Sequence, residues 1–236
     1  MEWYEAVEIV ESHIFKISTP RGSGTGFLLS SEVDGFMCTV ATAAHVIDQA
    51  HYWEENIRID HFKTGTSTLL RQPDRAIFID SEHDIARITF AYDQPLDIPQ
   101  SPIALAPEKM RLKVGSEIGW LGFPAIPGAN LCFFGGRVSS WIQNQHAYLV
   151  DGVAINGVSG GPAFAIDSSS ITIIGLVSAY MPNRATGETL PGLAVVRDVS
   201  RYHELARTLK SLEQAKSKES LESNPQPPTI STQANH

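Results

Sequence analysis

Three short stretches place a histidine, an acid and a serine along the chain in an order that suits nucleophilic catalysis. His45 ends Thr-Ala-Ala-His, Asp84 begins Asp-Ile-Ala, and Ser159 lies in Gly-Val-Ser-Gly-Gly-Pro. A serine hydroxyl is a weak nucleophile at neutral pH, so an imidazole must take its proton and a carboxylate must orient that imidazole. The order histidine, aspartate, serine is known for such triads. We therefore predict Ser159 as nucleophile, His45 as general base and Asp84 as the orienting acid.

The glycines around Ser159 suggest a second part of the same chemistry. Attack on a carbonyl creates an oxyanion, which needs preorganised donors such as backbone N–H groups. A glycine-rich turn permits the tight backbone that aims the Gly157 and Ser159 amides at one point. Each stretch alone has an ordinary structural explanation, since lone histidines, turn-ending acids and Gly-rich hairpins are common. Their conjunction in the right order favours catalysis.

Composition narrows the class of protein that carries these stretches. The chain has 236 residues, is 42% hydrophobic and 19% charged, and has a formal net charge of −8. These values are typical of a globular protein and argue against a binder of nucleic acid or anionic lipid. There is no apolar run of membrane-spanning length, and the acidic start Met1–Glu5 has no apolar signal region. We therefore expect a cytoplasmic protein without nucleic-acid or membrane partners.

The cysteines and histidines give no pattern of metal ligands. Cys38 and Cys132 are too far apart in sequence for a short-spaced ligand pair, and they form no disulfide framework. His51, His61 and His83 show neither an i, i+4 pair nor an HExxH motif, so surface histidines explain them better. We expect no metal and no other cofactor.

The elements that must position the three residues are mostly strands. Short β-branched or aromatic runs are separated by Gly, Pro and Asp, which predicts an all-β sandwich or barrel. These runs are 14–17, 27–29, 37–41, 76–79, 85–90, 117–121, 131–134, 148–150, 171–177 and 193–196. The Pro-rich connector 94–102 divides them into two groups, which suits two small β-barrels.

Four segments follow from this division. Residues 1–95 form an N-terminal helix, with apolar spacing from Trp3 to Val10, and a first barrel with His45 and Asp84. Residues 96–200 form a second barrel with Ser159. Residues 201–216 form a C-terminal helix with an apolar stripe. Residues 217–236 are polar and Pro-rich, and we expect them to be disordered.

The three stretches resemble the signatures of chymotrypsin-fold, trypsin-like serine proteases. Their surroundings are most similar to the HtrA/Deg branch of that family, over roughly residues 14–200. The segments that carry this second likeness are Arg21–Phe27, Gly119–Pro124, Asp151–Pro162 and Gly192–Val196. The resemblance implies two six-stranded antiparallel β-barrels with the site in the cleft between them. It also implies hydrolysis of peptide bonds in peptide or protein substrates through an acyl-enzyme, without a cofactor.

The resemblance also assigns a substrate pocket. Gly175–Ala179 is similar to the strand that lines the pocket for the side chain before the scissile bond. On that match Ser178 helps to hold Asp84, and Ala179 and Tyr180 border the pocket. Val153, six residues before Ser159, stands where trypsin-like recognition of Arg or Lys requires Asp. We expect a small or medium apolar side chain in this pocket, although Val153 as simple core packing is the plainer alternative.

Three departures from the family pattern carry expectations of their own. Val158 stands where secreted relatives have an Asp that pairs with a newly cut N-terminus, so we expect no zymogen activation of that kind. Cys38 has no partner cysteine near His45, which fits an intracellular enzyme. After the segment that resembles the protease domain only a short polar tail follows, so we expect this chain to lack the PDZ domain that HtrA proteins usually carry.

Two alternatives to an active endopeptidase remain open from the sequence. The chain could be a catalytically silent protease-fold module that binds peptides in the old cleft. It could also be a latent protease whose oxyanion loop is ordered by a protein partner or by a homo-oligomer. The glycines at 157, 160 and 161 leave this loop able to take two states.

Overall fold

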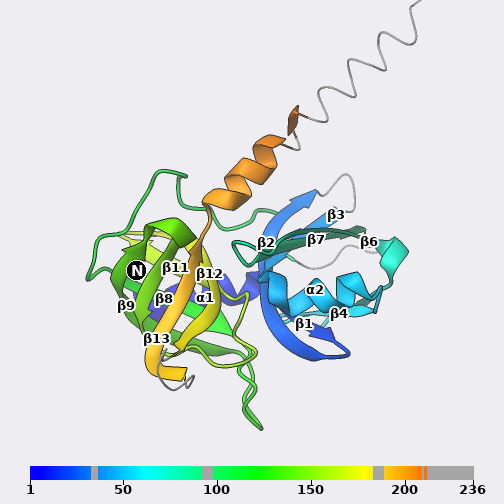
Figure 1. Cartoon of the computed structure of the whole chain (residues 1–236), viewed down its shortest axis with the longest axis horizontal. Helices are drawn as coiled ribbons and strands as arrows, with labels where there is room; N and C mark the ends of the chain where they lie inside the picture. Colours follow the sequence, from blue (N-terminus) through cyan, green and yellow to red (C-terminus); the bar gives the residue numbers. More distant parts are fainter. Residues whose placement is uncertain (33–36, 92–97, 183–188, 209, 212–236) are drawn as a thin grey trace, which may run out of the picture. The chain divides into compact units, whose positions relative to one another are not determined.

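The computed structural model describes residues 1–32, 37–91, 98–182, 189–208 and 210–211 (Figure 1). Met1–Val199 form one compact unit and Ser200–His236 a second. In the second unit the described residues are helical over 200–208 and at 210–211. The expected tail 217–236 and residues 212–216 of the expected helix lie outside the described residues. No helix in the described ranges is long and apolar enough to cross a membrane.

The first half of the chain folds into an antiparallel seven-stranded sheet, ordered β5-β4-β1-β2-β3-β7-β6. Its strands are β1 (Ile14–Thr19), β2 (Gly22–Glu32), β3 (Met37–Thr42), β4 (Ile57–His61), β5 (Ser67–Leu70), β6 (Arg75–Asp80) and β7 (Ile85–Ala91). Helix α2 (Ala44–Tyr52) follows β3, and 3₁₀ turns are formed by Glu11–His13, Gln72–Asp74 and Gln143–Gln145. Asp84 lies in the turn between β6 and β7, and His45 lies in the first turn of α2.

The second half forms a closed six-stranded barrel, ordered β10-β13-β12-β11-β8-β9 (Figure 1). Its strands are β8 (Glu117–Gly122), β9 (Cys132–Ile142), β10 (Ala147–Asp151), β11 (Pro162–Asp167), β12 (Ser170–Pro182) and β13 (Thr189–Asp198). Ser159 lies in the connection between β10 and β11. The expected chymotrypsin-like, mostly β fold is confirmed. The first sheet is a half-barrel that ends at β5 and β6, whereas the second is closed.

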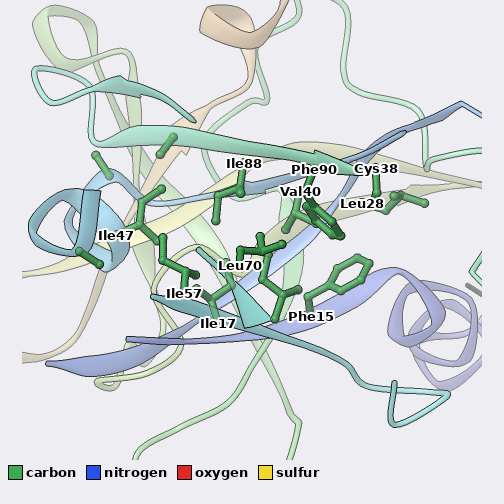
Figure 2. Close-up of a cluster of buried hydrophobic side chains, with 14 of the residues drawn as sticks. Phe15, Ile17, Leu28, Cys38, Val40, Ile47, Ile57, Leu70, Ile88 and Phe90 are labelled. Atoms are coloured by element: carbon green, nitrogen blue, oxygen red, sulfur yellow. The ribbon is translucent and has the colours of Figure 1, made fainter. Parts of the chain in front are cut away.

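A hydrophobic cluster fills the concave side of the first sheet (Figure 2). Phe15 and Ile17 alternate along β1 and point into it, as the two-residue period of a strand requires. Helix α2 adds Ile47, which is fully buried. Burial raises the pKa of the Cys38 thiol to about 12, so this side chain behaves as a small apolar group. The cluster anchors the helix that carries His45.

The N-terminal helix α1 (Trp3–Val10) has the bounds expected from its apolar spacing. Glu2 precedes it, and the Glu2 backbone N–H donates a 2.7 Å hydrogen bond to the Glu5 carboxylate, which caps the first turn. The ring of Trp3 packs on the second barrel, 5.5 Å from Phe133 of β9 and 5.8 Å from Phe164 of β11. Helix α1 therefore leads into β1 of one sheet while it packs on the other.

The glycine-rich start of β2 is strand, although its composition suggests a turn. It pairs antiparallel with β1, from Gly22 opposite Thr19 to Phe27 opposite Ile14. A Cβ at Gly24 would lie 2.6 Å from Val46 of α2, and one at Gly26 would lie 2.6 Å from Val40 of β3. The glycines are needed because helix and sheet approach the strand closely. Between Gly24 and Gly26, Thr25 is the one residue with a side chain.

Candidate active site

Asp84 holds both the side chain and the backbone of His45. The His45 Nδ1 atom lies 2.9 Å from each carboxylate oxygen of Asp84. The His45 backbone N–H donates a 3.0 Å hydrogen bond to the Asp84 Oδ1 atom. This amide is in the first turn of α2, where N–H groups lack helical partners and a negative charge is favourable. The arrangement fixes the imidazole with its Nε2 edge directed away from the carboxylate.

Asp84 adopts a backbone conformation that few residues take. Its φ is 53°, in the left-handed region that Asp tolerates better than most side chains. Such strained conformations cluster at functional sites, where surrounding contacts hold them. Ser178 supplies one such contact, because its buried hydroxyl donates a 2.5 Å hydrogen bond to the Asp84 Oδ2 atom.

The pKa values of the pair shift in opposite directions. Burial alone would raise the pKa of Asp84, but hydrogen bonds from His45 and Ser178, and the attraction of His45, hold it below its usual value. The hydrogen bond to Asp84 raises the pKa of His45 above its usual value, against a smaller lowering by burial. At neutral pH Asp84 is therefore ionised, and it stabilises the protonated imidazole.

Ser159 lies in the second, closed barrel and is linked to the His45–Asp84 pair through Ser178. The Ser159 hydroxyl donates a 3.2 Å hydrogen bond to the backbone carbonyl of Ser178. Ser178 thus contacts Asp84 with its side chain and Ser159 with its backbone. In the described part of the chain, no hydrogen bond joins Ser159 to His45. The structure brings the three predicted residues to one place, with the serine hydroxyl turned toward β12.

The loop before Ser159 presents two amides that are not used by the fold. Gly157 has a φ of +91°, and a Cβ there would lie 2.2 Å from the Phe123 carbonyl oxygen, so no other residue fits. Among the described residues, the backbone N–H groups of Gly157 and Ser159 donate no hydrogen bond. Both residues line a pocket of about 310 Å³ together with His45. Val158, between them, is fully buried.

Thr25 joins the two sheets at this loop, a role that was not predicted from the sequence. Its hydroxyl donates to the Gly157 carbonyl at 2.8 Å and accepts from the Phe123 N–H at 3.0 Å. Its backbone N–H donates to the Ser159 carbonyl at 2.8 Å, and its carbonyl accepts from the Thr42 hydroxyl at 2.7 Å. Thr25 is fully buried. A single polar side chain flanked by Gly24 and Gly26 was the signal in the sequence.

The residues expected at the substrate pocket are placed only in part. Val153 is 47% exposed and does not line the 310 Å³ pocket at Ser159. Ala179 and Tyr180 lie on β12, where their backbones pair with Val195 and Ala194 of β13. The side chains of Ala179 and Tyr180 lie outside the described residues. The preference for an apolar side chain before the scissile bond stays a prediction.

One expectation about the histidines is wrong. His61, expected at the surface, is 2% exposed because β4 places it beside Phe15, with ring centroids 4.9 Å apart. Its Nδ1 lies 2.9 Å from the Thr64 hydroxyl and its Nε2 lies 2.9 Å from the Ser12 carbonyl oxygen. His61 is therefore a core histidine whose two ring nitrogens both have partners.

Solved structures share this fold. The Rv3671c protease of M. tuberculosis H37Rv, in its inactive form, superposes with a TM-score of 0.59 at 19% identity, over 85% of this chain and 91% of that one. A serine-to-alanine mutant of it, also in the inactive form, gives 0.59 at 18% identity, over 85% and 88%. A serine endoprotease from Yersinia pestis gives 0.63 at 16% identity, over 89% of this chain and 66% of that one.

A comparison with curated proteins gave no match. Residues 24–176, more than half of the chain, match the trypsin-like peptidase domain. The match begins at Gly24, beside Thr25, and ends at Leu176 of β12, so it includes all three predicted catalytic residues. By this match the chain belongs to the trypsin-like peptidase family.

Proposed function

We propose that the protein is a serine endopeptidase in which His45, Asp84 and Ser159 form the catalytic triad. One observation supports this above all others. An imidazole oriented by a partly buried carboxylate, a serine and two unused backbone N–H groups border the same 310 Å³ pocket. Its substrates are peptides or proteins, as in the family to which the chain belongs.

In the proposed first half-reaction, the Ser159 hydroxyl leaves the Ser178 carbonyl by rotation about its Cα–Cβ bond and turns toward His45. Its oxygen attacks the scissile carbonyl while the His45 Nε2 atom takes the proton. The substrate oxygen becomes negatively charged and accepts hydrogen bonds from the Gly157 and Ser159 amides. Asp84 stabilises the imidazolium because its own pKa is held low and it stays ionised.

The tetrahedral intermediate then collapses and the peptide C–N bond breaks. The His45 imidazolium gives its proton to the leaving amine, and the acyl group stays on Ser159 as an ester. In the second half-reaction, His45 takes a proton from water, whose oxygen attacks the ester. Collapse of the second intermediate returns the proton to the Ser159 oxygen and releases the acid.

A latent protease is the second candidate, and one observation favours it. The Ser159 hydroxyl is hydrogen-bonded to the Ser178 carbonyl, which is not the geometry for proton transfer to His45. A protein partner or a second copy of the chain would then supply the contact that turns the serine. A silent peptide-binding module differs from this candidate in that no partner would restore activity.

A fluorophosphonate probe tests the proposed function directly. It reacts efficiently with a serine that a neighbouring histidine has activated, so we expect stoichiometric labelling of the purified protein. Ser159→Ala should abolish labelling, and Ser140→Ala, a change at an exposed serine on β9, should not. A folded wild-type protein that stays unlabelled would contradict an active enzyme. Repeating the assay with candidate partners would then separate the latent protease from the silent module.

Thr25→Val should slow catalysis without unfolding the protein. Valine has the shape of threonine but leaves the Gly157 carbonyl and the Phe123 N–H without the partner between them. The oxyanion loop would shift, and a displacement near 1 Å costs about a hundredfold in rate. We expect kcat to fall by about that factor with little change in KM.

Thr25→Ser is the matched control, because it keeps the hydroxyl and both of its hydrogen bonds. It should restore most of kcat and of the labelling rate. Steady-state kinetics of both variants, below their measured melting temperatures, check the prediction. Equal activity of the valine and serine variants would show that the hydroxyl does not position the loop.

A further inference from the structure

Two hollows on the protein surface share lining residues and therefore lie side by side; together they are called the groove. The 310 Å³ pocket contains Ser159 and His45 and also includes Arg21 and Gln49. A second hollow of about 600 Å³ includes Arg21 and Gln49 again and extends to Tyr52 and Trp53. Arg21 and Gln49 therefore form the junction between the proposed nucleophile and an aromatic pair.

Helix α2 sets the direction of this groove. His45, Gln49 and Tyr52 are four and three residues apart, so they lie on the same face of the helix. The opposite face is buried through Ile47 and Ala50. The helix rises roughly 10 Å between His45 and Tyr52, which is the span of about three extended residues.

The aromatic pair at the end of α2 is unusually open to solvent. Tyr52 is 78% exposed and Trp53 is 63% exposed, although both are large side chains. Their rings pack edge to face with centroids 5.2 Å apart, and both remain exposed enough to contact a third apolar group. Neither side chain belongs to the core cluster of the first sheet. Exposed aromatic groups of this kind mark interaction sites.

The chemistry of the reaction decides which part of a substrate would lie here. The imidazolium of His45 must reach the leaving amine, so the residues after the scissile bond begin beside His45. From there the groove leads along α2, past Gln49 and Arg21, to the aromatic pair. Glu55 holds the Arg21 side chain at 3.4 Å and leaves other guanidinium N–H groups able to donate to a substrate carbonyl.

We infer that Tyr52 and Trp53 bind an aromatic or long apolar side chain of the substrate, three or four residues after the scissile bond. The inference rests on the proposed function and narrows it. The substrates are then polypeptides that extend at least three residues past the cleavage site and carry an apolar residue at the third or fourth of them. Arg21 at the junction is paired with Glu55, so the charges there are balanced. We therefore expect apolar contact, and not charge, to determine which substrate side chain is preferred at this position.

The sequences of cleavage sites show directly which substrate position is preferred to be apolar. The wild-type enzyme digests a peptide library prepared from a bacterial proteome, and mass spectrometry aligns the products at the cut. We expect enrichment of Phe, Tyr, Trp or Leu at the third or fourth residue after the cut. Two quenched fluorescent peptides, made from the best-cleaved sequence with Phe or Ser at that position, should differ by about tenfold in kcat/KM.

The double variant Tyr52→Ser/Trp53→Ser should reduce this Phe-to-Ser ratio to near one. The control Leu69→Ser/Val114→Ser removes two other exposed apolar side chains, 56% and 70% exposed, and should keep the ratio. A ratio near one in the wild-type enzyme, or an unchanged ratio in the double variant, would overturn the inference. So would a change of oligomeric state in the double variant, because the pair would then be a contact between copies.

The fluorophosphonate assay distinguishes failure of this inference from failure of the proposed function. Cleavage and labelling without any preference after the cut would overturn the inference and leave the proposed function intact. Neither cleavage nor labelling in the folded wild-type protein would overturn the proposed function and this inference with it.

Discussion

Ser159→Ala should lower kcat by about a millionfold, the size of the loss when the nucleophile of a comparable triad is removed. The variant lacks the hydroxyl that forms the acyl-enzyme, whereas the two amides of the oxyanion loop are unaffected. A residual acceleration over water of about a thousandfold should therefore persist, because oriented donors still stabilise the intermediate. Cleavage of a quenched peptide at equal concentrations of folded wild-type and variant protein measures both quantities.

The interpretation of this variant depends on an unchanged binding site. KM should change little, because the methyl group of alanine leaves the shape of the pocket almost intact. A variant that still turns over at the wild-type rate would show that another group is the nucleophile. A variant that is unfolded, judged by its melting curve, would be replaced by Ser159→Gly, which also lacks the hydroxyl.

Asp84→Asn should lower kcat by about ten-thousandfold, as expected when an imidazole is held in the wrong tautomer. The amide oxygen can still accept the hydrogen bond that the His45 backbone N–H now gives to Asp84. The amide NH₂, however, would donate to Nδ1 and put the imidazole proton on Nε2, where a lone pair is needed.

The same variant should move the acidic limb of the pH profile. His45 must be neutral to act as a base, and its pKa is raised mainly by the hydrogen bond to Asp84. Activity of the wild-type enzyme should therefore fall as the pH drops through a pKa above the usual histidine value. Without the Asp84 charge that pKa falls, so the limb should shift to lower pH. The pH dependence of kcat/KM measures the shift.

Asp80→Asn is the matched control for this variant. Asp80 is the last residue of β6, directly before the turn that holds Asp84, and its carboxylate is 3.0 Å from the Nδ1 atom of His83. It should leave both kcat and the acidic limb close to those of the wild-type enzyme. Equal losses in the two variants would show a general effect on the turn and contradict the role assigned to Asp84.

Much of the candidate site could be predicted because its residues lie in short local patterns. His45, Asp84 and Ser159 each stand in a distinctive stretch, and Gly157 is needed by the backbone itself. Thr25 could not be predicted in the same way. Its role depends on hydrogen bonds to residues far along the chain, such as Gly157 and Phe123, and these exist only after both barrels are folded.

The fold shows a similar division between local and long-range causes. Strand β7, whose apolar and polar residues alternate, was expected at 85–90 and occurs at Ile85–Ala91. Strand β12 was expected at 171–177 and extends to Pro182. Helix α2 was missed, because Ala44 and Ala50 are too small to show an apolar stripe until Ile47 packs in the core. Strand β11 was missed because it begins at Pro162, directly after two glycines that favour a turn.

Ser178 forms hydrogen bonds with both Asp84 and Ser159, which come from different halves of the chain. The proposed base and acid, His45 and Asp84, lie in the first half of the chain, and the proposed nucleophile Ser159 lies in the second. Ser178 and Thr25 form hydrogen bonds between the two halves. Neither half, produced as a fragment, would contain this set of groups. The proposed catalytic site is thus complete only where the two sheets pack against each other.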